Sequence, residues 1–313
     1  MMIVHKIAAS QSNATVDALV EFLTPFLPSS FCIIAHLRTL PRQPDLTVYS
    51  SFDLNTLNNN AKLSSSPPSL FSIATQCKPI LIRYFCSGER SINVDTNGTA
   101  ELHVQSFFGE WVPAILRESG GHPCLVGSLN HRWVPFLRKW TSRAGPETQK
   151  YVSDKRTRES KPQTRSLQAG FISVPLSVLD IPRVIETSNI PRSREYILAR
   201  LPYSLCLRRP DEEAGSSKLA GWALIHEDGS IGALWVEPEF RGNGFSRYIV
   251  DGLVQKQLEL VEGDGENLCT CVDVSTGNIA AERLFTAMGW KPAWRCFWVT
   301  VVSSDSPEVI YGK

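Results

Sequence analysis

The sequence lacks any apolar run near the roughly 20 residues of a membrane-spanning helix. It also lacks a surplus of charge, because 32 Lys and Arg nearly balance 31 Asp and Glu, for a formal net charge of +1. Proteins that bind nucleic acids or anionic membranes usually carry a basic surplus, so we expect neither partner. The first 20 residues lack the basic head and apolar block of a signal peptide. We therefore expect a cytoplasmic protein, with a cryptic mitochondrial targeting segment left open.

No Cys-x-x-Cys pair occurs among the eight cysteines. In a chain of 313 residues, long enough to bury its own core, this scatter predicts buried thiols in a reducing compartment rather than a disulfide framework. Cys269 and Cys271 are two apart in an expected strand and so share one face of it. Packing is the favoured role for this pair over metal binding, and we expect no metal.

The length predicts about two domains, and a polar segment marks a boundary between them. Residues 141–166 hold seven basic and three acidic residues and few apolar ones. Such a segment buries too little surface to offset its ordering entropy, so it predicts a solvated linker; a basic binding patch is the alternative. The predicted division is an N-terminal α/β lobe at 1–140, a linker at 141–166 and a second domain at 167–313.

The first lobe shows alternating apolar segments. Helical periodicity predicts a helix over 15–23, whereas 32–36 and 80–86 are typical of short buried strands. Residues 107–116 and 133–140 are predicted to be helical or to flank helices. No catalytic set can be assembled from this half.

The second domain alternates strands and helices, which indicates a mixed α/β sheet. Within the helical stretch 176–187, the pattern places Leu179, Ile181 and Val184 inward. Asp228-Gly229 is a strong hairpin signal between two strands. Strands are expected at 171–174, 203–207, 219–225, 231–236, 268–274 and 290–302, and helices at 176–187, 191–201, 244–262 and 278–288.

A glycine-rich turn joins the strand at 231–236 to the helix that follows it. Gly242 and Gly244 let the backbone turn tightly and bring its N–H groups inward. Together with the helix N-terminus, such N–H groups form an anion site suited to a pyrophosphate, and Arg241 adds positive charge beside it. Neither a P-loop nor a dinucleotide-binding glycine motif is present.

A second motif runs from Asn278 to Trp290, beginning 37 residues after Arg241. Asn278 is a good helix N-cap, an apolar stripe follows, and Gly289 is placed to end the helix in a left-handed cap. By itself this segment predicts only a surface helix.

Together the two motifs resemble the GNAT superfamily of acyl-CoA-dependent N-acyltransferases. The first family signature, R/Q-x-x-G-x-G/A, corresponds to Arg241–Ser246 and departs from it at Ser246. The second signature, N-x-x-A-x-x-L-Y/F-x-x-x-G-F/W, matches throughout 278–290. Within the superfamily, residues 190–197 and 220–223 are most similar to the glycine N-acyltransferase-like branch, whose N-terminal half is often a degenerate GNAT-like lobe. The resemblance implies a GNAT fold in the second domain.

The resemblance also implies where the co-substrate binds. Acyl-CoA is expected in the V where the parallel strands at 231–236 and 268–274 splay apart. Backbone groups of the first strand should pair with the pantetheine arm, the glycine turn should hold the pyrophosphate, and one N–H near Trp235 should polarise the thioester carbonyl. The expected cofactor-binding residues are Leu234, Trp235, Val236, Arg241, Gly242, Asn243, Gly244, Phe245, Ser246, Asn278 and Phe285.

The general base is where the sequence departs from the family. A glutamate thought to act as base in glycine N-acyltransferases aligns with Ser230, whose hydroxyl is too weak a base at neutral pH. The thiolate-protonating tyrosine of the superfamily aligns with Phe285, which has no proton to give. The predicted catalytic-site residues are Ser230 by alignment, with Glu237 and Asp273 as substitute bases and His226 or Glu227 as further alternatives.

The predicted function is transfer of an acetyl or other acyl group from acyl-CoA to the amine of a small molecule, by direct attack in a ternary complex. An amino acid is one candidate acceptor. Two alternatives remain open: the same chemistry on a protein amine, and a catalytically silent acyl-CoA-binding protein.

Overall fold

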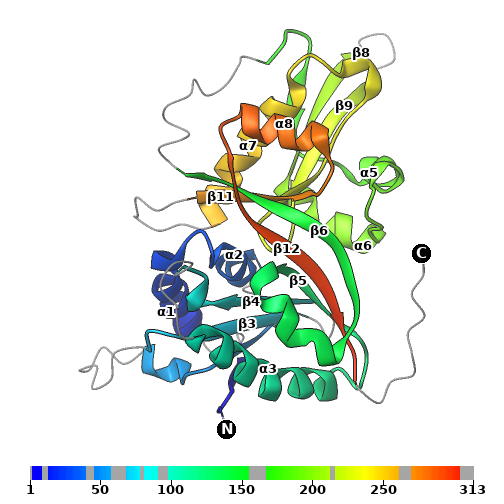
Figure 1. Cartoon of the computed structure of the whole chain (residues 1–313). Coiled ribbons are helices and arrows are strands. Elements are labelled where there is room, and N and C mark those ends of the chain that lie inside the picture. The colour runs from blue at the N-terminus through cyan, green and yellow to red at the C-terminus, as the bar shows by residue number, and fades with distance from the viewer. Residues whose placement is uncertain are drawn as a thin grey trace. The chain divides into compact units, whose positions relative to one another are not determined.

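A computed structural model describes residues 2–8, 13–39, 46–57, 68–77, 81–90, 98–154, 167–211, 216–260 and 269–303. The chain divides into two compact units, whose elements are labelled in Figure 1. Unit 1 contains Met1–Lys150, Ser275–Gly277 and Ala293–Lys313. Unit 2 contains Tyr151–Val274 and Asn278–Pro292.

Unit 1 is built on a mixed sheet with the strand order β1-β2-β3-β4-β5-β12. Neighbouring strands are antiparallel except β4 and β5, which run parallel from Leu81 opposite Leu125. The elements are β1 (His5–Ala8), α1 (Asn13–Leu23), α2 (Phe31–Thr39), β2 (Thr47–Ser50), β3 (Ser72–Cys77), β4 (Leu81–Cys86), α3 (Thr99–Glu118), β5 (Cys124–Asn130), a 3₁₀ helix (His131–Trp140), β6 (Thr141–Asp154) and β12 (Lys291–Val301).

Helix α3 connects the parallel strands β4 and β5 and supplies much of the unit 1 core. Its apolar residues recur at helical spacing, so that one face carries Phe107, Trp111 and Ile115, each fully buried. Tyr84 of β4 stacks on Trp111 with ring centroids 6.0 Å apart. A parallel pair of strands needs such a crossover, and burial of its aromatic face holds the helix on the sheet.

Unit 2 has the strand order β7-β8-β9-β10-β11, followed by the last residues of β6, 151–154, which belong to this unit. Strands β7 to β10 are antiparallel neighbours, whereas β10 and β11 are parallel. The elements are β7 (Ile172–Val174), α5 (Ile181–Thr187), α6 (Arg194–Arg200), β8 (Ser204–Asp211), β9 (Ser216–Ile225), β10 (Ile231–Val236), α7 (Phe245–Leu260), β11 (Cys269–Ser275) and α8 (Ile279–Ala287).

The two faces of the unit 2 sheet bury different clusters, because successive side chains of a strand point to opposite faces. On β9, Trp222 and Leu224 pack with residues of α5 and α6, whereas Ala223 and Ile225 pack with residues of α7 and α8. Figure 1 shows the two helix pairs on either side of the sheet. We call the first of these the α5–α6 face.

Both units repeat one order of elements. Each has a first strand, two helices, three further antiparallel strands, a crossover helix and a parallel strand. The strand beside β5 in unit 1 is β12, the last of the chain, and the strand beside β11 in unit 2 is β6. The predicted mixed α/β fold with a second, similar lobe is confirmed.

Two local predictions are wrong. Residues 32–36 belong to helix α2, not to a strand. The five successive residues 33–37 are all fully buried, and a helix buried on nearly every side shows no periodicity that distinguishes it from a buried strand. Leu179 is 90% exposed, whereas Ile181 and Val184 are buried as expected. Leu179 lies in a short 3₁₀ helix, Val178–Asp180, that precedes α5. Its tighter winding breaks the α-helical spacing, so the side chain of Leu179 faces solvent rather than the core.

The linker prediction is wrong over its first half. Residues 141–154 form strand β6, in which Thr148, Lys150 and Ser153 are buried, so polar side chains here face the interior. Residues 155–166 lie outside the described part of the chain. The units also depart from the predicted boundaries, because residues from Ala293 onward group with unit 1.

All eight cysteines lie in the described part of the chain and form no disulfide there, and all are buried except Cys32, which is half-buried. The predicted packing role of Cys269 and Cys271 agrees with their burial in β11. Among the described residues, no helix has the length and hydropathy needed to cross a membrane. The same part of the chain brings together no group of three or more His, Cys, Asp or Glu placed to hold a metal ion.

Candidate active site

Strand β10 is irregular in its middle. Its register against β9 shifts between Gly232 and Trp235, and Ala233 adopts a left-handed backbone with φ of 51°. A non-glycine residue in this region is uncommon and marks a bulge, which redirects backbone groups out of the ladder. Strained positions of this kind cluster at binding and catalytic sites.

The two parallel strands of unit 2 part after the start of β10. Ile231 lies opposite Val272 of β11, and within these two fully described strands no further ladder pair follows. The pairing of β10 with β9, in contrast, continues to Val236 opposite Gly221. The second half of β10 therefore has no ladder partner in β11, and whether acyl-CoA binds there stays a prediction.

The glycine turn follows directly at the end of β10. Gly242 and Gly244 have φ of 81° and 80°, values that side-chain-bearing residues rarely adopt. Helix α7 begins at the next residue, Phe245, so its first free N–H groups lie at the turn. Asn243 fixes the turn by donating from Nδ2 to the carbonyl of Phe240 at 3.1 Å.

A cavity of about 340 Å³ opens at this turn. Two guanidinium-bearing residues line it, and one of them, Arg247, lies outside the predicted motif. Arg241 donates from Nε to the carbonyl of Val236 at 3.0 Å and lies 5.0 Å from the ring centre of Trp235. Sequence reasoning missed Arg247, although a basic residue in the first turn of the helix was a usable signal. The lining residues are Val236, Phe240, Arg241, Gly242, Gly244, Phe245, Ser246, Arg247 and Leu284.

Helix α8 is capped as predicted. The Asn278 side chain accepts a hydrogen bond from the N–H of Ala281 at 3.2 Å, and Gly289 follows the helix with φ of 88°. Phe285 is buried, with its ring centre 5.1 Å from that of Trp290 and 6.3 Å from that of Tyr151. Phe285 thus helps to build the core behind the cavity, whose lining includes its neighbour Leu284.

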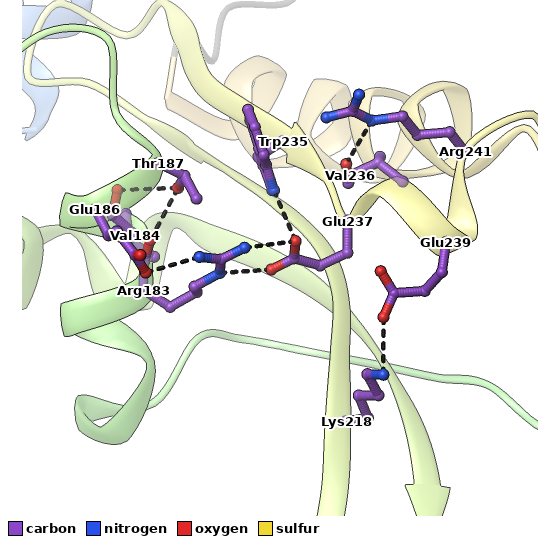
Figure 2. Close-up of polar contacts among 10 residues, drawn as sticks. All are labelled: Arg183, Val184, Glu186, Thr187, Lys218, Trp235, Val236, Glu237, Glu239 and Arg241. Atoms are coloured by element: carbon purple, nitrogen blue, oxygen red, sulfur yellow. Dashed lines mark hydrogen bonds and ion pairs between the residues drawn. The ribbon is translucent and has the colours of Figure 1, made fainter.

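Glu237, one of the predicted bases, is held by a two-pronged ion pair. Arg183 of α5 donates from Nε and Nη2 to the two carboxylate oxygens at 2.7 and 2.8 Å, and Trp235 donates from its indole N–H at 3.2 Å. Figure 2 shows these contacts at the end of β10. The hydrogen bonds from Arg183 lower the pKa of Glu237 further than burial raises it. A carboxylate with both oxygens engaged and a lowered pKa is a poor proton acceptor.

Arg183 was not identified from the sequence, because it lies 54 residues before Glu237 and no local pattern links the two. Its guanidinium also contacts Glu186 at 2.7 Å. The arrangement ties α5 to the end of β10 and gives Glu237 a structural role.

Ser230 and Asp273 occupy different settings. Ser230 is buried in the hairpin, where its hydroxyl and its N–H both donate to Oδ1 of Asp228, at 2.6 and 3.1 Å. These two hydrogen bonds stabilise the turn. They engage the hydroxyl of Ser230 with Asp228, which indicates a structural role for it. Asp273 is half-buried on β11, one residue beyond the position where β11 pairs with β10.

A tyrosine–histidine pair lies on the α5–α6 face. The hydroxyl of Tyr196 on α6 is 2.7 Å from Nδ1 of His226, which follows β9. A Cβ atom added at Gly232 would overlap Nε2 of this imidazole, so the ring lies directly on the backbone of β10 beside its bulge. His226 was among the alternatives from the sequence; Tyr196 was not, because its helical position alone indicated nothing about a partner 30 residues away.

Comparison with known proteins points to the same part of the chain. Residues 211–299 match the family described as FR47-like protein. This match spans β9 to β12 and so includes the glycine turn and α8. No curated protein matches the sequence.

Solved structures show similarity in fold. A Drosophila protein solved by X-ray crystallography is similar over 97% of this chain and all of its own, with 11% identity and a TM-score of 0.63. A tandem GNAT protein from the clavulanic acid biosynthesis pathway covers 97% of this chain and 100% of its own, at 12% identity and a TM-score of 0.49. A GCN5-related N-acetyltransferase from Sphaerobacter thermophilus covers 97% and 98%, at 12% identity and 0.42. At identities this low, similarity to a solved structure shows only the fold. The Drosophila structure, which has the highest of these three TM-scores, is the one that supports this conclusion.

Proposed function

We propose that this chain is an acyl-CoA-dependent N-acyltransferase that transfers an acetyl or other acyl group to the amine of a small molecule. The observation that carries the proposal is the cavity at the glycine turn, where Gly242 and Gly244 adopt positive φ directly before the first turn of α7. Backbone N–H groups at a helix N-terminus bind pyrophosphate without further side chains. Arg241 and Arg247 add positive charge to the same cavity.

The remaining cofactor contacts follow from β10. Beyond Ile231 its backbone is paired with β9 but not with β11. The N–H of Glu237 donates to the carbonyl of Ala220 across the β9–β10 ladder, so in the alternating antiparallel pattern the backbone groups of Leu234 and Val236 point away from β9, where an extended pantetheine arm can pair with them. The carbonyl of Val236 accepts a hydrogen bond from Nε of Arg241, so the N–H of Val236 is the group left for the cofactor arm. Ala233 has a φ of 51°, and we expect this bulge to turn a backbone N–H toward the thioester carbonyl.

The acceptor should approach from the α5–α6 face. The half-buried Trp235 lies there beside the bulge, with its ring centre 6.5 Å from that of the fully buried Trp222 behind it. Such an aromatic pair suits a compact acceptor with apolar parts, and an amino acid remains one candidate. The closer likeness to the glycine N-acyltransferase-like branch and the cytoplasmic location stay predictions.

Thiol release tests the proposal. Acetyl-CoA is incubated with the protein and a panel of amino acids, aliphatic amines, arylalkylamines and a peptide with a free N-terminus, and free thiol is measured. We expect acceleration by at least one small amine, with the acylated product identified by mass spectrometry. Acceleration by the peptide alone would move the assignment to a protein acyltransferase.

A catalytically silent acyl-CoA-binding protein is the second candidate. It is favoured by two observations: the hydroxyl of Ser230 is engaged by Asp228, and Phe285 has no proton to give a leaving thiolate. Binding of acetyl-CoA without thiol release for any amine or peptide of the panel would select this candidate.

A further inference from the structure

The cavity at the glycine turn is lined by two arginines that are held on different elements. Arg241 donates from Nε to the carbonyl of Val236, at the end of β10, as Figure 2 shows. Arg247 lies in the first turn of α7 and donates from Nη2 to the carbonyl of Ala287, the last residue of α8, at 3.3 Å. One cation is thus held at the strand and the other at α8, and both line the same cavity.

Arg241 and the start of α7 together match a diphosphate. The guanidinium of Arg241 lies 5.0 Å from the ring centre of Trp235, at the strand end of the glycine turn. The unpaired N–H groups at the start of a helix act there with about half of an elementary positive charge. A diphosphate diester carries one negative charge on each phosphate, so these two groups nearly balance it. A second guanidinium is more than a diphosphate at the turn requires.

Arg247 retains donors for a further anion. Its bond to Ala287 uses one of the N–H groups of the guanidinium and, among the described residues, is the single hydrogen bond of this side chain. The side chain is half-buried and lines the cavity together with Leu284 of α8. A guanidinium in this setting can bind a phosphate through two parallel N–H···O bonds.

The carboxylates around the turn leave this positive charge in place. Glu237 is in an ion pair of its own, and Glu239 is paired with Lys218 at 2.8 Å (Figure 2). Asp251 lies one turn further along α7, and no ion pair joins it to Arg247 in the described part of the chain. Burial raises the pKa of Asp251 more than the charge of Arg247 lowers it. Arg247 is therefore the cation that the α8 side of the cavity offers to a ligand.

We propose that Arg247 binds a second phosphate group of the co-substrate, separate from the diphosphate at the glycine turn. The inference rests on the acyl-CoA site of the proposed function. CoA carries a monophosphate on its ribose in addition to the diphosphate, and a phosphate monoester has close to two negative charges at neutral pH. Its oxygens can accept both prongs of the Arg247 guanidinium. The protein should therefore distinguish CoA from dephospho-CoA, which lacks only the ribose phosphate.

The test compares the binding of these two ligands to the full chain by calorimetry at low salt. The wild-type protein should bind CoA about tenfold more tightly than dephospho-CoA, the effect of one charge-assisted contact. Arg247→Ala should lower the affinity for CoA about tenfold and leave that for dephospho-CoA within about twofold, so the preference disappears. Unchanged binding of dephospho-CoA also shows that the variant folds.

Three further variants separate the ribose phosphate from the diphosphate. Arg241→Ala should weaken both ligands by the same factor, because both carry the diphosphate. Arg247→Lys keeps the charge but loses the two-pronged geometry, so it should restore only part of the preference for CoA. The matched control is Arg283→Ala, since Arg283 is an exposed arginine of α8 outside the cavity lining, and neither affinity should change more than about twofold.

The outcomes distinguish the two proposals. If the wild-type protein binds CoA and dephospho-CoA equally, or if Arg247→Ala weakens both equally, the role of Arg247 is wrong and the proposed function stands. If the preference for CoA depends on Arg247 but no amine accelerates thiol release, the role of Arg247 stands and the transfer reaction fails. If neither ligand binds, both proposals fail.

Discussion

The two units share one order of strands and helices but complete the corresponding turn with different residues. After β10, unit 2 has Gly242 and Gly244 at positive φ and a cavity lined by two arginines. After β4, unit 1 has the buried Glu89, whose carboxylate accepts from the indole N–H of Trp133 at 2.9 Å and from Asn130 at 3.3 Å. In the described part of this junction, unit 1 thus has a buried carboxyl group where unit 2 has a glycine turn with backbone N–H groups and two arginines, and we place the proposed phosphate site in unit 2.

The pair of parallel strands in each unit, β4 and β5 in unit 1 and β10 and β11 in unit 2, also differs in what lies beside it. In unit 2 the ladder between β10 and β11 ends after Ile231. In unit 1 the buried guanidinium of Arg83 reaches from β4 to Gly127 of β5, where an added Cβ would overlap it, and lies 4.9 Å from the ring centre of Trp298. The two units thus share a fold, and local side chains decide whether the space beside the parallel strands can accept a ligand.

The largest expected effect tests the glycine turn. Gly244→Val places a β-branched residue at φ of 80°, which the turn can accommodate only by rearranging, so affinity for CoA should fall by about 100-fold or more in calorimetry. The matched control is Gly98→Val before α3, where φ is 66°, which should leave CoA affinity unchanged. Equal losses in both variants would contradict the difference between the units.

A smaller effect is expected from the cavity arginines. Arg247→Ala removes a guanidinium from the cavity of unit 2 and should weaken CoA binding by roughly tenfold at low salt, with less difference at high salt. Arg117 lines a cavity in unit 1 and is the control, because Arg117→Ala should not change CoA affinity. A stronger effect of Arg117→Ala would place the binding site in unit 1.

The ion pair at the end of β10 should contribute to stability more than to proton transfer. Glu237→Gln removes charge from the contact with Arg183 and should lower Tm at pH 7 by roughly 2–4 °C. Because the folded state lowers the pKa of Glu237, its stabilisation is complete above the unfolded pKa and is lost as pH falls through the folded one. The Tm difference should therefore vanish in acid. A loss of kcat of about 100-fold or more would restore Glu237 as a base.

The smallest effect concerns the turn of unit 1. Burial raises the pKa of Glu89 to about 7, so the folded protein retains a proton that the unfolded chain releases above its ordinary pKa near 4.3. The stability that Glu89 contributes should therefore decline as pH rises from about 4.5 through 7. Glu89→Gln should show a flatter dependence of Tm on pH between 5 and 8. Identical slopes in the two proteins would show that this carboxylate ionises freely.

Local patterns predicted the parts of the site that depend on backbone conformation. Positive φ at Gly242 and Gly244 and the N-cap role of Asn278 follow from residue types within a few positions. The two family signatures, at 241–246 and 278–290, also predicted the fold correctly, because each lies where a strand is followed by a helix.

Contacts across the sequence were not predictable in this way. The clamp of Arg183 on Glu237 and the Tyr196–His226 contact join residues 54 and 30 positions apart, which only the folded chain brings together. Strand β6 was missed because its buried residues are polar, as Lys150 shows with its Nζ 3.3 Å from Sγ of Cys32. A buried strand is predicted from its apolar residues, so a strand whose buried residues are polar cannot be recognised from the sequence pattern.

The most direct measurement is a crystal structure of the protein soaked with CoA. The account predicts density for the pyrophosphate against the backbone N–H groups of residues 242–246, with the pantetheine arm along the second half of β10. Density for the pyrophosphate in unit 1, or none anywhere at a saturating concentration, would contradict it.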